Sequence, residues 1–188
     1  MNKLKDFVLV IDVESTCWEP KSSQPADEIS EIIEIGISVV NTKELEIVKN
    51  SSIIIKPQRS TISEFCTQLT TITSETVSSG ISYESAVDLL RKDYQSNKTT
   101  FISWGDYDRK MFEKNCKDYN VVYPFGPRHL NLKNIFSIFN NIDKEVGLDY
   151  AVKYYNLPFE GTHHRADSDA YNTAKVFICM LKQFRQAL

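Results

Sequence analysis

Two acids directly follow an apolar run near the start of this sequence. Residues 7–11 read Phe-Val-Leu-Val-Ile, which predicts a strand buried on both faces, and Asp12 and Glu14 come next. Because side chains alternate along a strand, both carboxylates are expected on one face. Crowded carboxylates repel each other and resist desolvation, and Mg²⁺ or Mn²⁺ relieves both problems because these ions prefer carboxylate oxygens. The pair indicates a metal site, with two solvent-facing acids past the strand end as the alternative.

A third acid stands where a later strand is expected to give way to a helix. Residues 99–103 read as a buried strand and residues 107–119 as a helix. Functional groups gather outside the strand ends in open α/β sheets, so Asp108 is expected to point back toward Asp12. Asp106 is interpreted as the cap of that helix rather than as a ligand.

A histidine and a fourth acid stand five residues apart in the C-terminal part of the chain. A helix that begins near Asp167 would leave His164 on the preceding loop and carry Asp169 in its first turn, so that both side chains aim at one point. The helix N-terminus also favours a phosphate there. A lone histidine is more often structural than catalytic, but this spacing and the distant acids favour a catalytic site. His163 is the alternative base, and it lacks the spacing.

The elements that must position these residues follow the order of a mixed sheet covered by helices. The polar residues between the second and third strands predict a hairpin. The expected strands are 7–11, 32–40, 47–55 and 99–103, and the expected helices are 63–69, 82–95, 107–119, 131–139, 148–155 and 167–184. Ser63 and Ser82 are the expected N-caps of the first two helices.

Length and composition are those of an ordinary globular protein. The chain has 188 residues, 41% hydrophobic and 25% charged, and one domain over 1–188 is expected. The four cysteines are irregularly spaced, which argues against a disulfide framework or a zinc site. The N-terminal apolar run is too short for a signal peptide or a membrane span, so a cytoplasmic protein without membrane contact is expected. The net charge of −3 is unusual for a protein that grips long nucleic acid by charge alone.

The three acidic motifs together resemble the signature of the DEDDh 3′→5′ exonuclease superfamily. The matching residues are Asp12-Val13-Glu14, then Tyr107-Asp108 with Met111-Phe112, then His164 with Asp169. Other segments look like the branch that holds Eri-type exoribonucleases and KapD-like proteins. These segments are 12–17, 31–36, Lys56-Pro57, Phe65-Cys66, 69–72, Gly147-Leu148 and 161–165. The resemblance covers about residues 7–181 and implies an α/β, RNase H-like fold, in which α-helices flank a mixed β-sheet.

The resemblance also implies a cofactor and catalytic roles. Two divalent cations, Mg²⁺ or Mn²⁺, would be held by Asp12, Glu14, Asp108 and Asp169. His164 would take a proton from the attacking water, and 5′-mononucleotides would leave from the 3′ end. The charge of the ions at the scissile phosphate explains how a chain of negative net charge acts on nucleic acid. Arg165 is expected to add to this positive charge locally.

The substrate that the resemblance implies is a single-stranded 3′ end, with RNA favoured over DNA, while protein partners stay unknown. The residues expected to contact the terminal nucleotide are Glu14, Ser15, Thr16, Leu69, Ile72, Tyr107 and His164. Core packing is an equal alternative for Leu69 and Ile72. Ser15 stands where many relatives have alanine.

Two other functions fit the same fold. One is a non-catalytic module that binds nucleic acid or a protein partner, and the other is a proofreading exonuclease attached to a polymerase. A missing ligand would favour the first, but all five signature positions are filled. The Eri-like segments outside the motifs argue against the second.

Overall fold

A five-stranded mixed sheet forms the centre of the computed structural model, which describes residues 6–187. Its strands are β1 (Phe7–Ser15), β2 (Ile32–Asn41), β3 (Glu46–Ile54), β4 (Thr100–Ser103) and β5 (His129–Asn131). The order across the sheet is β3-β2-β1-β4-β5. The first three strands are antiparallel, whereas β4 runs parallel to β1 and β5 parallel to β4. The carboxyl ends of β1 and β4 therefore meet at one edge, where α/β sheets usually bind ligands.

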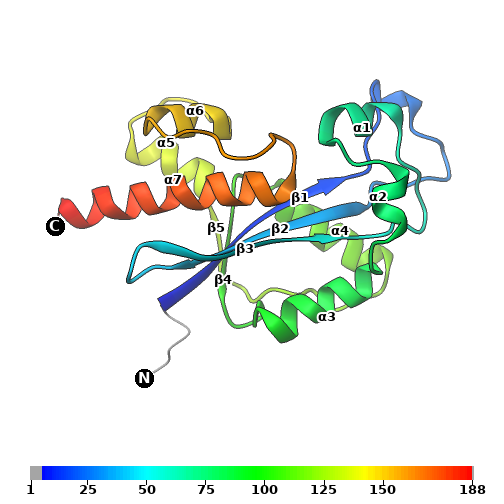
Figure 1. Ribbon diagram of the computed structural model, residues 1–188, viewed down its shortest axis with the longest axis horizontal. Helices are drawn as coiled ribbons and strands as arrows, with labels where there is room; N and C mark the ends of the chain where they lie inside the picture. The colour runs from blue at the N-terminus through cyan, green and yellow to red at the C-terminus, as the bar shows by residue number, and fades with distance from the viewer. Residues whose placement is uncertain (1–5, 188) are drawn as a thin grey trace.

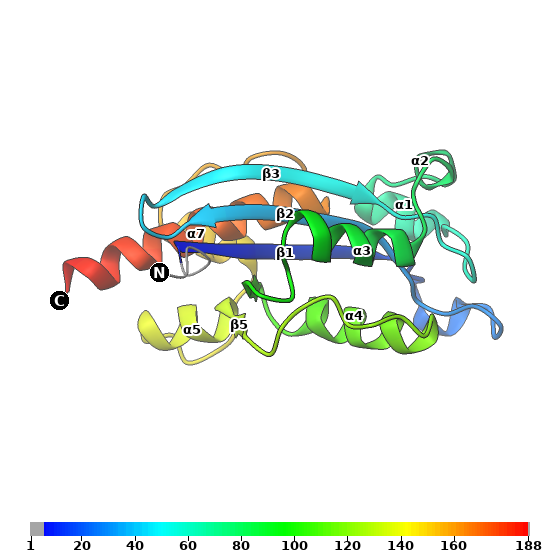
Figure 2. The same cartoon turned by 90° about the horizontal axis from the view of Figure 1, so that it is seen from below.

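Helices cover both faces of this sheet (Figure 1). They are α1 (Glu64–Thr70), α2 (Ser74–Ser78), α3 (Tyr83–Asp93), α4 (Tyr107–Asp118), α5 (Leu132–Phe139), α6 (Leu148–Tyr154) and α7 (Ala166–Gln186), with a 3-10 turn at Lys21–Ser23. The view from below shows α3 in front of β1 and β2, α7 behind them and α4 beside β1 (Figure 2). The expected mixed sheet with flanking helices is thus confirmed. None of the helices within residues 6–187 has the length and apolar content needed to cross a membrane.

The alternation of side chains along β1 divides the core into two layers. Leu9, Ile11 and Val13 pack with α3 and α4 on one face. Val8 and Val10 pack with α5, α6 and α7 on the other. Asp12 and Glu14 continue the second series by the two-residue period of a strand, so both carboxylates lie on the face that α7 covers.

β1 is four residues longer than the sequence predicted, because β2 continues to pair with it. Asp12 lies opposite Gly36 and Glu14 opposite Glu34, and the register shifts only between Glu14 and Ser15. The two acids are therefore held within a paired strand and do not point into solvent past its end. This regular backbone fixes where their carboxylates point.

Two short elements were missing from the sequence-based expectation. α2 has five residues and is held by a capping box between Thr73 and Thr76, which is too short for a periodic apolar signal. β5 has three residues and ends at Asn131, whose side chain then caps α5 by accepting from the amide of Asn134. The N-caps expected at Ser63 and Ser82 are confirmed. Residues 1–5 and 188 of the expected domain lie outside the described residues.

Candidate active site

A cavity of about 380 Å³ opens at the edge of the sheet where β1 and β4 end. That volume lies within the range of small-molecule sites. Eight residues that the sequence singled out line it: Asp12, Glu14, Ser15, Leu69, Tyr107, Asp108, His164 and Asp169. Val13, Cys17, Trp104, Gly147, Leu148 and His163 complete the lining. Side chains from three distant parts of the chain thus meet in one cavity.

The second motif is brought to the cavity by the turn between β4 and α4. Gly105 makes this turn with φ +110°, a conformation that L side chains rarely adopt. Asp108, in the first turn of α4, then reaches across to β1, where its Oδ1 accepts a hydrogen bond of 3.0 Å from the amide of Val13. This bond fixes the carboxylate next to the first motif, as the sequence predicted.

Asp106 is at the N-cap position of α4, but the expected capping hydrogen bond is not formed. Its carboxylate instead contacts Arg109 and accepts a hydrogen bond of 3.1 Å from Asn131. The αR backbone of Asp106 explains this difference, because a capping side chain usually requires an extended residue. Asp106 therefore ties α4 to the end of β5.

The third motif is a short loop that leads into α7. His164 has a left-handed backbone, with φ +60°, and its amide donates a hydrogen bond of 3.1 Å to Oδ2 of Asp169. Asp169 lies in the first turn of α7, as expected, and is buried. Its Oδ1 is buried without a hydrogen-bond partner among residues 6–187. A buried carboxylate oxygen that lacks a partner is costly, and a cation in the cavity would satisfy it.

Glu14, His164 and Asp169 form a group that fits a metal ion. One ligand atom from each lies within 4.8 Å of the others. The group combines two carboxylates with an imidazole, which suits Mn²⁺ and Mg²⁺ through the carboxylates. Asp12 and Asp108 line the same cavity but are not members of this close group. The donor set and the unsatisfied Asp169 oxygen both fit a bound divalent cation.

The carboxylates repel each other in the absence of a cation. Burial, with the charges of Asp169 and other acids, raises the pKa of Glu14 to about 9. Burial also raises the pKa of Asp108 to about 7 and that of Asp169 to about 6, against the hydrogen bonds they accept. The pKa of Asp12 is raised by burial and by Asp108. Such mutual elevation is typical of a site built to hold positive charge.

These pKa values predict that stability without metal falls as pH rises. The folded protein retains protons on Glu14, Asp108 and Asp169 at pH values where the unfolded chain has lost them, so the free energy of unfolding decreases from about pH 4 toward pH 9. Mg²⁺ or Mn²⁺ favours the ionised carboxylates and should reduce this loss. Thermal unfolding from pH 5.5 to 8.5, with EDTA or Mn²⁺, measures both slopes. Equal slopes would contradict a cation among these carboxylates.

Arg165, which was expected to add positive charge near the scissile phosphate, is instead paired with a buried glutamate. Its guanidinium forms two hydrogen bonds, of 3.0 and 2.9 Å, with the carboxylate of Glu34. Glu34 is completely buried in β2 and was not recognised as a functional residue from its type. Its position in an otherwise apolar run, Ile-Ile-Glu-Ile, is the signal that could have identified it.

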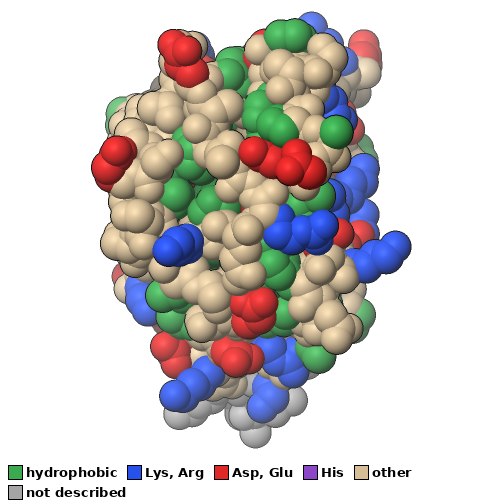
Figure 3. All heavy atoms as spheres, turned by 90° about the vertical axis from the view of Figure 1, so that its right-hand side faces the viewer, with side chains coloured by type: hydrophobic (Ala, Val, Ile, Leu, Met, Phe, Trp, Pro, Cys, Tyr) green, Lys and Arg blue, Asp and Glu red, His purple; other side chains and the backbone are tan. Residues whose placement is uncertain are grey.

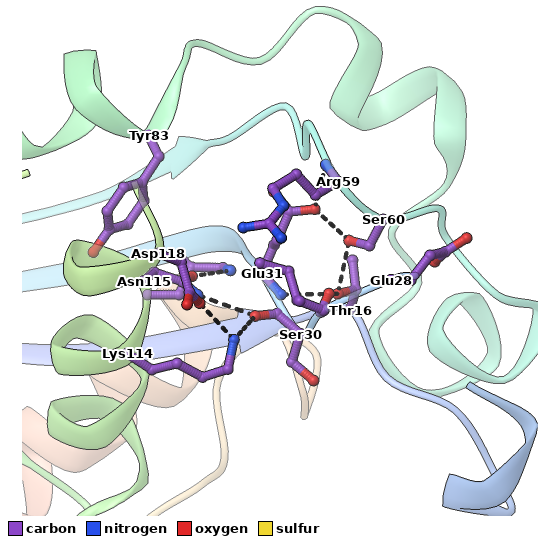
Figure 4. Close-up of polar contacts among 12 residues, drawn as sticks. Thr16, Glu28, Ser30, Glu31, Arg59, Ser60, Tyr83, Lys114, Asn115 and Asp118 are labelled. Atoms are coloured by element: carbon purple, nitrogen blue, oxygen red, sulfur yellow. Dashed lines mark hydrogen bonds and ion pairs between the residues drawn. The ribbon is translucent and has the colours of Figure 1, made fainter. Parts of the chain in front are cut away.

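Thr16 lies outside the cavity and its polar groups are already occupied. Its amide donates to the carbonyl of Glu31, and its hydroxyl accepts hydrogen bonds from the amide of Glu31 and from Ser60. Figure 4 shows these residues together, with the Glu31 carboxylate turned to the 58–60 loop. Gln58 and Arg59 donate their amides to that carboxylate at 2.9 Å each. Thr16 is therefore held within the protein and, unlike Glu14 and Ser15, does not line the cavity.

Ile72 and Leu69 differ in placement. Ile72 is 0% exposed and packs with Ile33, Cys66 and Val77, which agrees with the packing alternative. Leu69 is half-buried and lines the cavity. Leu69 is in the last turn of α1, whereas Ile72 lies beyond the left-handed C-cap residue Thr71, which changes the direction of the chain.

Two hydroxyls meet at the cavity wall. Ser15 Oγ and the Tyr107 hydroxyl are 2.6 Å apart, and Tyr107 is 54% exposed. His163 also lines the cavity, with Nε2 3.8 Å from Asp149. His129 is a structural residue: its Nε2 forms a hydrogen bond of 2.9 Å with Ser103 and its ring packs on Phe101.

One face of the molecule carries charged side chains of both signs. Figure 3 shows the face that carries α1 and α2, where Lys and Arg side chains alternate with Asp and Glu and form no continuous basic band. A long strand would gain little from such a face by charge alone.

Comparison with known proteins matches this geometry. A family model described as "Exonuclease" (RNase_T) matches residues 9–177. The probable 3′-5′ exonuclease KapD of Bacillus subtilis is 30% identical over 171 residues, which cover 90% of this chain and 82% of that protein. The 3′-5′ exoribonuclease 1 of Rattus norvegicus is 26% identical over 187 residues, 94% of this chain. The chain spans only 53% of the length of that relative.

The fold is also similar to a solved nuclease domain. The crystal structure of the nuclease domain of 3′hExo, a DEDDh family member bound to rAMP, superposes with a TM-score of 0.81 at 24% identity. The match covers 95% of this chain and 92% of that domain. The expected RNase H-like fold is thereby confirmed.

Proposed function

Because the chain belongs to the exonuclease family whose model matches residues 9–177, we propose that it shortens single-stranded nucleic acid from the 3′ end and prefers RNA to DNA. The chain is a 3′→5′ exonuclease of the DEDDh type. We further propose its substrate, its metal ions and the role of each residue. The observation that carries the proposal is the convergence of all five signature side chains on one cavity.

The acids of the cavity are assigned to metal binding. Asp12, Glu14, Asp108 and Asp169 would hold two divalent cations, Mg²⁺ or Mn²⁺. Bound ions would supply Lewis-acid charge for the phosphate and make a bound water more acidic. The raised pKa values of these carboxylates and the unsatisfied Asp169 oxygen support this assignment.

His164 is assigned the role of general base. Burial and the neighbouring His163 lower its pKa, so its imidazole is neutral and able to accept a proton at neutral pH. It would take one proton from the water that attacks the last phosphodiester. The P–O bond to the 3′ oxygen of the preceding nucleotide breaks, and that oxygen takes up a proton. The products are a 5′-mononucleotide and a strand with a new 3′ hydroxyl.

The preference for RNA rests on the cavity wall and on one relative. The hydroxyls of Ser15 and Tyr107 share one hydrogen bond, which leaves a second hydroxyl proton and several lone pairs for a ligand. A ribose 2′-OH is both donor and acceptor, and it is the group that distinguishes RNA from DNA. The similarity to a 3′-5′ exoribonuclease supports the same substrate.

Removal of either hydroxyl should reduce the preference for RNA. With Ser15→Ala or Tyr107→Phe, we expect the ratio of the kcat/KM values for RNA and DNA to fall roughly 2- to 10-fold, the effect of one hydrogen bond. Phenylalanine keeps the ring for stacking on the base. Single-turnover rates on RNA and DNA of one sequence measure the ratio. Tyr154→Phe, on the exposed surface of α6, is the control and should leave the ratio unchanged.

The function itself is tested with 5′-labelled single-stranded RNA and the matching DNA. The full chain is incubated with each strand in Mg²⁺, in Mn²⁺ and in EDTA. A ladder that shortens from the 3′ end only with metal, faster on RNA, supports the proposal. Binding of both strands without degradation in any metal would favour the non-catalytic module. Equal rates on DNA would remove the RNA preference and leave the exonuclease.

The remaining parts of the proposal concern the setting of the reaction. Cys17, Cys66, Cys116 and Cys179 are free thiols, which supports a reducing, cytoplasmic location. The net charge of −3 supports a short, single-stranded substrate and not a long duplex.

A further inference from the structure

A buried carboxylate in β2 holds the loop that carries the third motif. Glu34 is 0% exposed, and each of its oxygens accepts two hydrogen bonds. Oε1 accepts from Ser52 Oγ at 2.6 Å and from Arg165 Nη2 at 2.9 Å. Oε2 accepts from Arg165 Nε and from the amide of Ala166, both at 3.0 Å. The carboxylate is therefore fully satisfied within the protein and is not available as a metal ligand.

The partners of Glu34 lie between the two functional residues of the third motif. Arg165 and Ala166 follow His164 directly and precede Asp169 by one helical turn. The amide of His164 is itself bonded to Asp169, so the loop and the first turn of α7 form one closed unit. Interactions that hold residues 165 and 166 in place therefore also position the imidazole of His164 and the carboxylate of Asp169.

The backbone at residues 166 and 167 packs directly against Gly36 of β2. A Cβ atom built on Gly36 would lie 1.8 Å from the carbonyl oxygen of Ala166 and 2.5 Å from the amide nitrogen of Asp167. Gly36 lies opposite Asp12 in the sheet, and Glu34 lies opposite Glu14. β2 thus places the third motif directly beside the two acids of the first motif.

Burial alone would raise the pKa of Glu34, but the bonds from Arg165, Ser52 and Ala166 outweigh it and the pKa is lowered. Glu34 is therefore ionised, and its charge offsets that of Arg165. Charge-assisted, forked bonds of this kind have both strength and a defined direction. Such bonds can hold the neighbouring His164 and Asp169 in a fixed orientation.

We infer that Glu34 is a positioning residue, which fixes His164 and Asp169 against Glu14 by anchoring Arg165 and Ala166. This inference rests on the proposed function, because it concerns the geometry of the proposed metal site. Without the anchor, the loop loses its bonds to β2, and the guanidinium of Arg165 is free to pair with the nearby acids. Both changes weaken the site for a cation without removing any of its ligands.

The test compares Mn²⁺ binding, measured by calorimetry on the full chain, with the metal concentration that gives half-maximal activity. Glu34→Gln is expected to weaken Mn²⁺ binding about 10- to 100-fold, the range seen when a group that orients metal ligands is lost. Half-maximal activity should shift to a higher metal concentration by the same factor. Arg165→Met should likewise weaken Mn²⁺ binding and raise the metal concentration for half-maximal activity. This variant keeps the hydrogen bonds from Ser52 and Ala166 to Glu34, so it serves as the test if Glu34→Gln does not fold.

Glu31→Gln is the matched control. Glu31, directly before β2, is also buried, but its carboxylate accepts hydrogen bonds from the 58–60 loop and not from the third motif (Figure 4). We expect this variant to lower the Tm while Mn²⁺ affinity stays within about 3-fold of the original protein, because none of its bonds reaches residues 164–169. A general loss of stability would instead move metal affinity in both glutamate variants alike.

Mn²⁺ binding by Glu34→Gln or Arg165→Met equal to that of the original protein would overturn the inference. If Arg165→Met raised only the KM for RNA, Arg165 would be a substrate contact and the positioning role would be wrong. If the original protein neither bound Mn²⁺ nor degraded RNA, the proposed function would fail, and this inference with it. The two failures are therefore distinguishable.

Discussion

Asp169→Asn should reduce the exonuclease rate by roughly 10³-fold, because it removes about 4 kcal/mol of charge-dependent stabilisation from the reacting phosphate. Asparagine can still accept the hydrogen bond from the amide of His164, so the loop keeps its shape.

The Asp169→Asn substitution should also stabilise the metal-free protein. Above pH 6 the Asp169 carboxylate is ionised although burial raises its pKa, and its removal should add about 1–3 kcal/mol to the free energy of unfolding. Single-turnover rates and thermal unfolding in EDTA measure the two effects.

Asp167→Asn is the control for this variant. Asp167 lies in the same first turn of α7, and the substitution changes the charge equally, but its carboxylate bonds Ser168 and does not line the cavity. We expect its rate to stay within about 3-fold of the original, because only a first-turn charge near a helix N-terminus is lost. An Asp169→Asn protein that was inactive and also less stable would indicate damage to the fold and would contradict the metal-site interpretation.

The sequence was informative wherever a residue type conflicts with its surroundings. Asp12 and Glu14 after a fully apolar run, and Asp169 in a helix of otherwise apolar spacing, are costly unless a cation is present, and this cost made them recognisable. The order of strands and helices followed from apolar periodicity, which depends only on neighbouring residues. Both inferences use local information.

What the sequence did not reveal depends on contacts between distant residues. Arg165 is a positively charged residue beside a proposed phosphate site, but it binds Glu34, 131 positions away, because β2 passes under α7. Thr16 forms hydrogen bonds with Glu31, which directly precedes β2, and with Ser60, which follows β3. Leu69 lines the cavity from the last turn of α1, whereas Ile72, beyond the C-cap of α1, packs in the core. No local pattern carries such information, because it is set by tertiary packing.

The imidazole of His164 has two possible roles that a single variant can separate. Its ligand atom lies within 4.8 Å of those of Glu14 and Asp169, so it could bind a cation or serve as the general base. We expect His164→Asn to reduce the rate roughly 10²- to 10⁴-fold, as for loss of a general base, with Mn²⁺ affinity nearly unchanged. Asparagine is the suitable replacement because it tolerates the left-handed backbone at φ +60°. Calorimetry with Mn²⁺ and the pH dependence of the single-turnover rate are the measurements.

His163→Asn provides the comparison on the neighbouring residue. The rings of His163 and His164 are 4.1 Å apart, and the charge of His163 lowers the pKa of His164. The variant should therefore keep the maximal rate and move the acid limb of the pH profile to higher pH, because His164 then holds its proton more strongly. In His164→Asn that limb should disappear, since the group that must lose a proton is gone. A large loss of Mn²⁺ affinity in His164→Asn, with the limb retained, would make His164 a metal ligand and transfer the role of base to another group.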